Sequence, residues 1–363
     1  MAKVNILMPV FNSVQRNGNM IHTALNSLLN QTFTDFKLSI LDNISDDETP
    51  DICRFYAEKD ERIDFKVDTE RVFPEGGINK LASKCTDPYL MIANCDDKWD
   101  LSYIEKLHNV LQAKPEMDCA YSNGSHLGVT NNTGGVLITD DQINDYTLST
   151  KQNFHSFIQF RNVIPLLFGL FKTKAYQSAL PYVVFDDIAA NVDNLFASKY
   201  FLFGNSAYFL NENLFYYRNR PRKLEAETIS GMPTEPLLIF IFYVRHQLKL
   251  FLELQQYTDD ILLKLIALDS SLQQMCFLLS WIVKDLVKTE LDKNLSNNIG
   301  MILPPLRTGS IDFTPIQLHN DLLERCGKIK KILNEVEIYY GGDPIIKSTR
   351  DTLDESIKMI SGG

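Results

Sequence analysis

The sequence lacks several patterns that would each assign it to a large class of proteins. Its six cysteines form no C-x-x-C pair and no zinc-type spacing, and its six histidines form no H-x-x-H or H-E-x-x-H cluster. Neither G-x-G-x-x-G nor G-x-x-x-x-G-K-[ST] follows any expected strand. A zinc centre, a Rossmann-type dehydrogenase and a P-loop NTPase are therefore disfavoured.

Positive charge and long apolar runs are also scarce. The 363 residues contain 36 Lys and Arg against 46 Asp and Glu, whereas a nucleic-acid-binding protein needs a basic face. No uninterrupted apolar stretch reaches the ~18 residues of a membrane span. The first residues show no signal-peptide pattern. We expect a cytoplasmic protein that does not cross a membrane, with peripheral contact at its inner face left open.

Strand and helix patterns alternate over the first hundred residues. Apolar strands are expected at 3–9, 37–41, 63–67 and 89–93, and amphipathic helices at 20–30, 78–85 and 100–113. The S-x-x-E segment from Ser45 to Glu48 has the form of a capping box, which would open a further helix. This rhythm predicts an α/β fold with a mostly parallel central sheet flanked by helices.

The pattern changes along the rest of the chain. A strand at 118–122 is followed by a polar stretch, 123–144, that suggests a long hairpin or loop, and 208–217 reads as a last strand. Residues 236–288 and 315–336 are rich in Leu and Ile at helical spacing. We expect a nucleotide-binding domain at 1–228 and a helical C-terminal domain at 229–363. The latter would serve packing, homo-oligomer formation or membrane-surface contact through Lys328, Lys330 and Lys331.

Acidic residues follow the strand at 89–93 directly. The sequence MIANCDDKWD, residues 91–100, places Asn94, Asp96 and Asp97 at the end of the strand. Ligands bind at such strand ends in open α/β sheets, and hard oxygen ligands suit Mg²⁺ or Mn²⁺ carrying a diphosphate. A turn followed by a helix N-cap is the plainer interpretation of the same residues.

Several segments resemble, in the same order, the motifs of family 2 glycosyltransferases with the GT-A fold. They are KVNILMPVFN (3–12), NSLLNQTFTDF (26–36), LDNISDD (41–47), the glycine segment 77–79, NCDD (94–97), NVDN (191–194) and the pair Tyr217-Arg218. The resemblance covers roughly the first 220 residues and is most specific at 26–36. It implies a bacterial enzyme of surface-polysaccharide synthesis.

The resemblance also implies roles for individual residues. Asp193 would be the catalytic base, with Asp186 and Asp187 as competitors, and Asp96 with Asp97 would bind Mn²⁺ or Mg²⁺. One base and a metal on the leaving diphosphate imply single displacement with inversion. Asp42 would accept the N3 hydrogen of uracil or thymine, and Lys80 would either reach the donor or be solvated. Nucleotide contacts are implied for Pro9, Phe11, Asn12, Asp42, Gly77, Asn79, Asn94, Asp96 and Arg218.

One residue departs from the family pattern. Asn94 stands where the first aspartate of D-x-D-D is usual, so one negative charge is missing from the metal site.

The sequence predicts a glycosyltransferase that moves a sugar from a nucleotide-sugar, preferably a UDP-sugar, to a glycan or glycolipid acceptor. The alternatives are a non-catalytic nucleotide- or glycan-binding protein of the same fold and a sugar-phosphate nucleotidyltransferase. The latter needs a Gly- and Arg-rich loop, which PVFNSVQRNG does not supply.

Overall fold

The computed structural model describes residues 3–72, 74–128, 133–137, 146, 153–154, 157, 163–183, 192–218, 236–269, 271–272, 315–340 and 342–361. The chain divides into two compact units. The first comprises Met1–Val184 and Val192–Glu225, and the second comprises Phe185–Asn191 and Ala226–Gly363. The divide falls among residues 219–235, which lie outside the described residues.

The first unit is built on a nine-stranded sheet with the strand order β3-β2-β1-β4-β8-β6-β9-β5 and with β7 paired to β6. β1, β2, β3 and β4 are parallel neighbours, as are β6 and β9, whereas β8, β5 and β7 pair antiparallel. The expected α/β class with a mostly parallel sheet is therefore confirmed. The strands are β1 (Val4–Val10), β2 (Phe36–Asp42), β3 (Ile63–Val67), β4 (Tyr89–Ile92), β5 (Lys98–Trp99), β6 (Cys119–Leu127), β7 (Thr133–Val136), β8 (Leu170–Lys172) and β9 (Ala207–Arg218).

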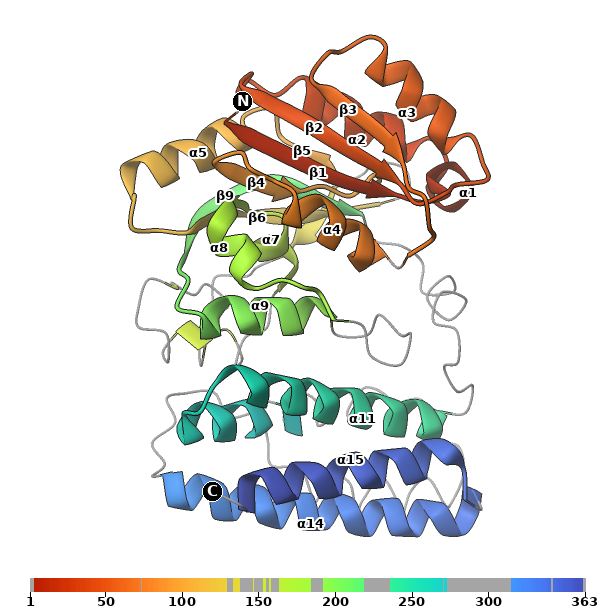
Figure 1. Ribbon diagram of the computed structural model, residues 1–363, viewed down its shortest axis with the longest axis vertical. Coiled ribbons are helices and arrows are strands. Elements are labelled where there is room, and N and C mark those ends of the chain that lie inside the picture. Colours follow the sequence, from red (N-terminus) through yellow and green to blue (C-terminus); the bar gives the residue numbers. More distant parts are fainter. Residues whose placement is uncertain are drawn as a thin grey trace. The chain divides into compact units, whose positions relative to one another are not determined.

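Helices flank this sheet, as Figure 1 shows for β1, β2 and β3. On α2, Ile21, Ala24, Leu25 and Leu28 are fully buried, which is the face that their three- and four-residue spacing predicts. Burying a Leu or Ile side chain stabilises the fold by about 1.5–3 kcal/mol. The helices of this unit are α1 (Ser13–Asn17), α2 (Met20–Leu29), α3 (Thr49–Ala57), α4 (Pro74–Ser83), α5 (Tyr103–Ala113), α7 (Val163–Leu167), α8 (Thr173–Ser178) and α9 (Val192–Leu202).

The register of the parallel strands aligns their carboxyl ends. Val10 pairs with Asp42, and Asp42 pairs in turn with Val67, the last residue of β3. On the other side of β1, Leu7 pairs with Ile92, the last residue of β4. Residues that follow β1, β2, β3 and β4 therefore meet at one edge of the sheet, as expected for a ligand site in this fold class.

The capping-box interpretation of Ser45 to Glu48 is wrong. Helix α3 begins at Thr49 and has no side-chain cap, and the Ser45 hydroxyl donates to Asp42 Oδ1 at 2.5 Å. The Ser45 backbone N–H donates to the other Asp42 oxygen at 3.0 Å. Because the side chain of Asp42 is fully buried, its carboxylate needs donors, and this need outweighs the local capping pattern.

Two further expectations differ from the structure. β6 continues through residues 123–127, where a loop was expected, because it pairs with β9 along this whole segment. With β7 it forms an antiparallel pair, so the hairpin alternative for this region is correct as far as the described residues go. The helix expected at 100–113 begins at Tyr103, and the buried Trp99 before it belongs to the short strand β5.

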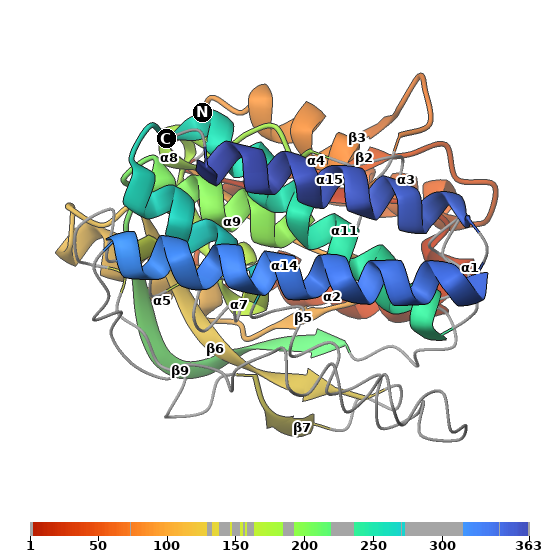
Figure 2. The same cartoon turned by 90° about the horizontal axis from the view of Figure 1, so that it is seen from below.

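The second unit is helical in its described residues. α11 (Pro236–Leu254), the short 3₁₀ helix η3 (Gln255–Tyr257), a helical segment at 261–269, α14 (Pro315–Tyr340) and α15 (Pro344–Ser361) are present. α15 packs on both α11 and α14, and the three helices lie side by side in Figure 2. The buried Arg325 pairs with the buried Asp269 at 3.1 Å. No helix among the described residues is long and apolar enough to cross a membrane.

Candidate functional site

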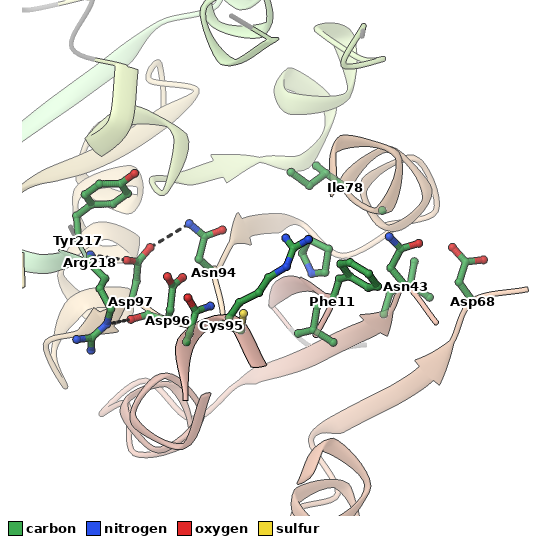
Figure 3. A pocket seen from close by; sticks show the side chains of 16 residues that line it. Phe11, Asn43, Asp68, Ile78, Asn94, Cys95, Asp96, Asp97, Tyr217 and Arg218 are labelled. Carbon is green, nitrogen blue, oxygen red and sulfur yellow. Dashed lines mark hydrogen bonds between the residues drawn. The ribbon is translucent and has the colours of Figure 1, made fainter. Parts of the chain in front are cut away.

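A cavity of about 360 Å³ opens at the edge where the parallel strands end. Figure 3 shows one group of polar side chains at Asn94, Asp96, Asp97 and Arg218, another at Asn43 and Asp68, and Phe11 between them. All of the lining residues belong to the first unit. They are Pro9, Val10, Phe11, Arg16, Asn17, Leu41, Asn43, Asp68, Gly77, Ile78, Asn94, Cys95, Asp96, Asp97, Tyr217 and Arg218.

Asp97 is held by two neighbours at the first of these groups. Its Oδ1 accepts the backbone N–H of Arg218 at 2.8 Å, and its Oδ2 accepts the Asn94 side-chain amide at 3.1 Å. Asn94, the residue that departs from the family pattern, therefore donates to Asp97, which an aspartate could not do while ionised. Both carboxylate oxygens of Asp97 therefore accept hydrogen bonds from the protein, and Asp96 lies beside it on the cavity wall.

Arg218 places a buried cation at the same end of the cavity. Its Nε donates to the backbone oxygen of Asp96 at 2.7 Å, and a terminal nitrogen donates to the carbonyl of Gly128 at 2.8 Å. Burial lowers the pKa of the guanidinium, and the charges of Asp96 and Asp97 oppose that effect. Since arginine stays protonated even so, its charge offsets part of the negative charge of the two aspartates.

The second group lies at the ends of β2 and β3. The side chain of Asn43 donates to the Val72 carbonyl and accepts the Val72 N–H, which fixes the loop after β3. Asp68 lines the cavity, and its backbone N–H donates to the Asp42 carbonyl at 2.8 Å. Desolvation opposes ionisation of Asp68, but the hydrogen bonds from Lys80 and from backbone N–H groups, together with the charge of Lys80, outweigh it and lower the pKa of this carboxyl. Lys80 therefore binds Asp68 in this structure.

Phe11 separates the two groups and carries cations on its ring. The guanidinium of Arg16 lies 4.7 Å from the ring centroid, and that of Arg71 lies 4.6 Å from it. Guanidinium groups stack on aromatic faces in this way and also pair with phosphate oxygens. The aromatic ring could therefore stack on a planar base, and the guanidinium groups could bind a negatively charged diphosphate.

Gly77 brings α4 close to the strand end at Pro9. A Cβ added at Gly77 would lie 3.0 Å from the Pro9 Cβ, so a larger residue would displace the cavity wall. The expectation of a glycine at this place near the nucleotide therefore has a steric reason.

Three expected nucleotide contacts do not line the cavity. Asp42 is fully buried beneath Ser45, and the side chain of Asn12 exchanges hydrogen bonds with Asp46. Asn12 also has φ +44°, a left-handed conformation that asparagine tolerates well. Asn79 binds both backbone groups of Tyr182. In this structure the three residues shape the surroundings of the cavity.

Asp193 lies in the first turn of α9, apart from the cavity lining. The residue is exposed at the surface, yet desolvation by the surrounding protein raises the pKa of its carboxyl to about 6. A carboxylate with this pKa is a better proton acceptor than an ordinary aspartate near neutral pH. Its competitors Asp186 and Asp187 lie outside the described residues.

A divalent metal ion would find only a partial set of protein ligands here. Among the described residues, no group of three or more His, Cys, Asp and Glu side chains converges in a way that could hold a metal. The Asp96 carboxylate on the cavity wall is nevertheless a hard oxygen ligand, and Mg²⁺ is commonly bound by one or two carboxylates together with substrate phosphates. The residues fit a metal that arrives with a diphosphate.

Sequence reasoning missed several residues of the cavity wall. Asp68 follows the strand expected at 63–67 as Asp42 follows the strand expected at 37–41, so the rule that selected Asp42 could also have selected Asp68. Arg16 had no comparable signal, because its position depends on the short helix α1 folding back over Phe11.

Residues 5–173 match the family model described as glycosyl transferase family 2. Glycosyltransferase GlyA of Streptococcus pneumoniae is 21% identical over 223 residues, which are 61% of this chain and 31% of that protein. TuaG of Bacillus subtilis, a glycosyltransferase named for teichuronic acid biosynthesis, is 29% identical over 119 residues, or 33% of this chain and 44% of TuaG. The chain thus spans less than half the length of these relatives.

Solved structures share the fold at low sequence identity. The 1-349 fragment of TarS from S. aureus matches with a TM-score of 0.56 and 15% identity over 99% of this chain and 92% of that chain. The same fragment has been solved with UDP-GlcNAc, with a TM-score of 0.50, 14% identity and coverage of 99% and 90%. A mannosyltransferase from Pyrobaculum calidifontis, solved with GDP-Man and Mn²⁺, has a TM-score of 0.50 and 13% identity over 92% and 87%.

Proposed function

We propose, from the premise that this chain belongs to glycosyl transferase family 2 through residues 5–173, that it transfers a sugar from a nucleotide-sugar to an acceptor hydroxyl. The cavity carries the proposal, because it joins an aromatic wall and an acceptor carboxylate at one end to Asp96 and a buried arginine at the other. This order of groups matches a base followed by a diphosphate. The preferred donor is a UDP-sugar, and the acceptor is a glycan or glycolipid of bacterial surface-polysaccharide synthesis.

The base of the donor would lie against Pro9 and Phe11. Asp68 lies on the cavity wall there and accepts hydrogen bonds from Lys80, whereas Asp42 is fully buried and bonded to Ser45. Each carboxylate oxygen has two lone pairs, so Asp68 can accept a further donor. A uracil N3–H donates one hydrogen bond, which a single carboxylate oxygen accepts. We therefore assign uracil recognition to Asp68 and give Asp42 the supporting role of fixing the loop after β2.

The diphosphate would lie toward Asp96 and Arg218. Asp96 would hold a divalent ion, Mn²⁺ or Mg²⁺, which when bound supplies charge neutralisation for the leaving nucleoside diphosphate. Arg218 holds Asp97 and the Asp96 backbone in place, and its own positive charge favours an anionic ligand.

Asp193 would take the proton of the acceptor hydroxyl. As the acceptor oxygen bonds to the anomeric carbon, its proton passes to the Asp193 carboxylate, and the bond from that carbon to the diphosphate breaks. A single displacement of this kind inverts the anomeric centre, so no second carboxylate nucleophile is needed.

Calorimetric titration with UDP, with and without Mn²⁺, tests the metal-dependent donor site. We expect Mn²⁺ to tighten UDP binding in the unaltered protein, and Asp96→Asn to remove most of that gain. Asp51→Asn is the matched control, because Asp51 is an exposed acid on α3 that does not line the cavity. UDP binding that is absent, or equally tight with and without Mn²⁺, would contradict the metal-dependent function.

A further inference from the structure

Two carboxyl groups outside the cavity wall lie at the starts of two helices, close enough for the charge of Asp193 to raise the pKa of Glu75. Glu75 lies in the first turn of α4, and Asp193 lies in the first turn of α9. The Oε2 atom of Glu75 is buried and has no hydrogen-bond partner. A buried polar atom without a partner is costly, so its presence beside the expected base calls for an explanation.

Tyr182 fixes the two helices relative to each other. Asn79 donates to the Tyr182 carbonyl at 3.0 Å and accepts the Tyr182 N–H at 2.8 Å, while the Tyr182 ring stacks on Phe196 with centroids 4.4 Å apart. Asn79 is four residues after Glu75, and Phe196 is three residues after Asp193. Residues so spaced share a helix face, so both carboxyl groups leave their helices on the sides that face Tyr182.

We propose that Glu75 is a positioning residue for the proton transfer, forming with Asp193 a carboxyl pair in which Asp193 is ionised and Glu75 keeps a proton. The proposal rests on the proposed function, in which Asp193 is the base. A protonated Glu75 can lie beside the Asp193 carboxylate without repelling it, whereas two adjacent carboxylates would move apart.

The electrostatics of the pair support this distribution of the proton. Desolvation raises the pKa of Asp193 to about 6. Desolvation first, and then the charge of Asp193, raises the pKa of Glu75 to about 7. Between these values Asp193 is mostly ionised and Glu75 mostly protonated, as expected for coupled carboxyl groups.

Among the residues that the structure describes, the tyrosines and lysines near the pair do not supply a competing charge in this range. Tyr176 and Tyr182, whose hydroxyls lie 3.1 Å apart, have raised pKa values because of burial and stay neutral. On α4, Lys80 is bound to Asp68 and Glu70. On α9, the buried Lys199 donates to the Pro181 carbonyl at 2.9 Å.

Thermal unfolding as a function of pH tests the pair without any substrate. The folded-state pKa of Glu75, about 7, lies above its ordinary value of 4.5. The stabilisation from its bound proton is therefore fully present below about pH 4.5 and is lost as the pH rises through 7. We expect the melting temperature of the unaltered protein to fall relative to that of Glu75→Gln between pH 5 and pH 8.

A double-mutant cycle isolates the coupling to Asp193. The pH at which Glu75→Gln changes the melting temperature should move lower in the Asp193→Asn background, because the neighbouring charge is gone. Glu70→Gln is the matched control, since Glu70 is exposed and precedes α4. An unchanged pH dependence in Glu75→Gln, or an unmoved transition in the Asp193→Asn background, would overturn the pairing.

Turnover of UDP-GlcNAc, used as a probe donor, tests the positioning role. We expect kcat/KM to rise through about pH 6 and to fall above about pH 7, with Glu75→Gln keeping the rise and losing the fall. A Glu75→Gln profile identical to that of the unaltered protein, or turnover lost at every pH while UDP binding and folding persist, would overturn the role. If the unaltered protein turns over no nucleotide-sugar, the proposed function fails, and the unfolding cycle still decides whether the two carboxyl groups are coupled.

Discussion

Individual residues of the cavity are held by partners that the local sequence does not indicate. Asp97 is bound through both oxygens, Asp42 is covered by Ser45, and Asn12 is tied to Asp46. These contacts fix the positions of several similar acidic side chains. The cavity wall carries Asp96 and Asp97 at one end and Asp68, which is bonded to Lys80, at the other.

We expect substitution of Asp68 to weaken UDP binding and substitution of Asp42 to lower thermal stability. Asp68→Asn should weaken UDP binding by roughly tenfold, because a wall carboxylate that accepts the uracil N3–H is replaced by an amide. Asp42→Asn should instead lower the melting temperature, since the buried carboxylate accepts both the N–H and the hydroxyl of Ser45. Calorimetry with UDP and thermal unfolding measure the two effects separately. Weaker UDP binding in Asp42→Asn, with unchanged binding in Asp68→Asn, would assign uracil recognition to Asp42 instead.

Asn94→Asp restores the aspartate that the family pattern has at this position. The change removes the amide that donates to Asp97 and places two carboxylates side by side, so we expect a loss of roughly 1–3 kcal/mol in stability at pH 7. The loss should shrink at low pH or with Mn²⁺ present, because either condition removes the repulsion. Thermal unfolding at pH 5 and pH 7, with and without Mn²⁺, measures this loss. Equal stability of Asn94→Asp and the unaltered protein at pH 7 would contradict a stabilising hydrogen bond from Asn94 to Asp97.

The observed bounds of helices and strands agree with those expected from the sequence where a buried face produces a regular spacing of apolar residues. The strand at 4–10 and the helix at 20–29 lie within a residue of their expected bounds, because apolar spacing alone specifies which face is buried. Elements whose ends depend on partners distant in the sequence do not have the bounds that the sequence predicts. α3 starts later than the capping pattern indicates, and β6 extends because β9 lies beside it.

Leu25→Ala tests the importance of the buried face of α2. Leu25 is fully buried, so its truncation should cost about 2–5 kcal/mol and leave UDP affinity unchanged. Leu101→Ala is the matched control, because Leu101 is 51% exposed and its truncation should change stability by less than about 0.5 kcal/mol. Denaturant unfolding measures both variants, and similar losses in the two would show that α2 is not part of the stable core.

At the scale of the whole molecule, two roles predicted from the sequence for the helical unit have still to be tested. Homo-oligomer formation and contact with a membrane surface both assign a role to residues 229–363. Lys328 and Lys330 are in ion pairs with Glu324 and Asp354, which reduces the basic face that anionic lipids would attract. The formal net charge of −10 acts in the same direction.

We therefore expect the protein to stay in the supernatant when it is sedimented with vesicles that contain anionic lipid at physiological salt. Lys328→Glu should leave this result unchanged, because the lysine is already neutralised by Glu324. Recovery of the unaltered protein with the vesicles, and its loss in Lys328→Glu, would establish the membrane contact instead.

The sequence by itself determined the fold class and the edge at which the site lies. Apolar periodicity specifies parallel strands, and parallel strands align whatever follows their carboxyl ends. Only the tertiary structure decided which of the aligned side chains face a ligand. Asp42 ends β2 and Asp68 directly follows the neighbouring β3, yet Asp42 is buried and bonded to Ser45, whereas Asp68 lines the cavity. Glu75 and Asp193 are 118 positions apart in the chain, and only the packing of α4, Tyr182 and α9 brings their carboxyl groups together.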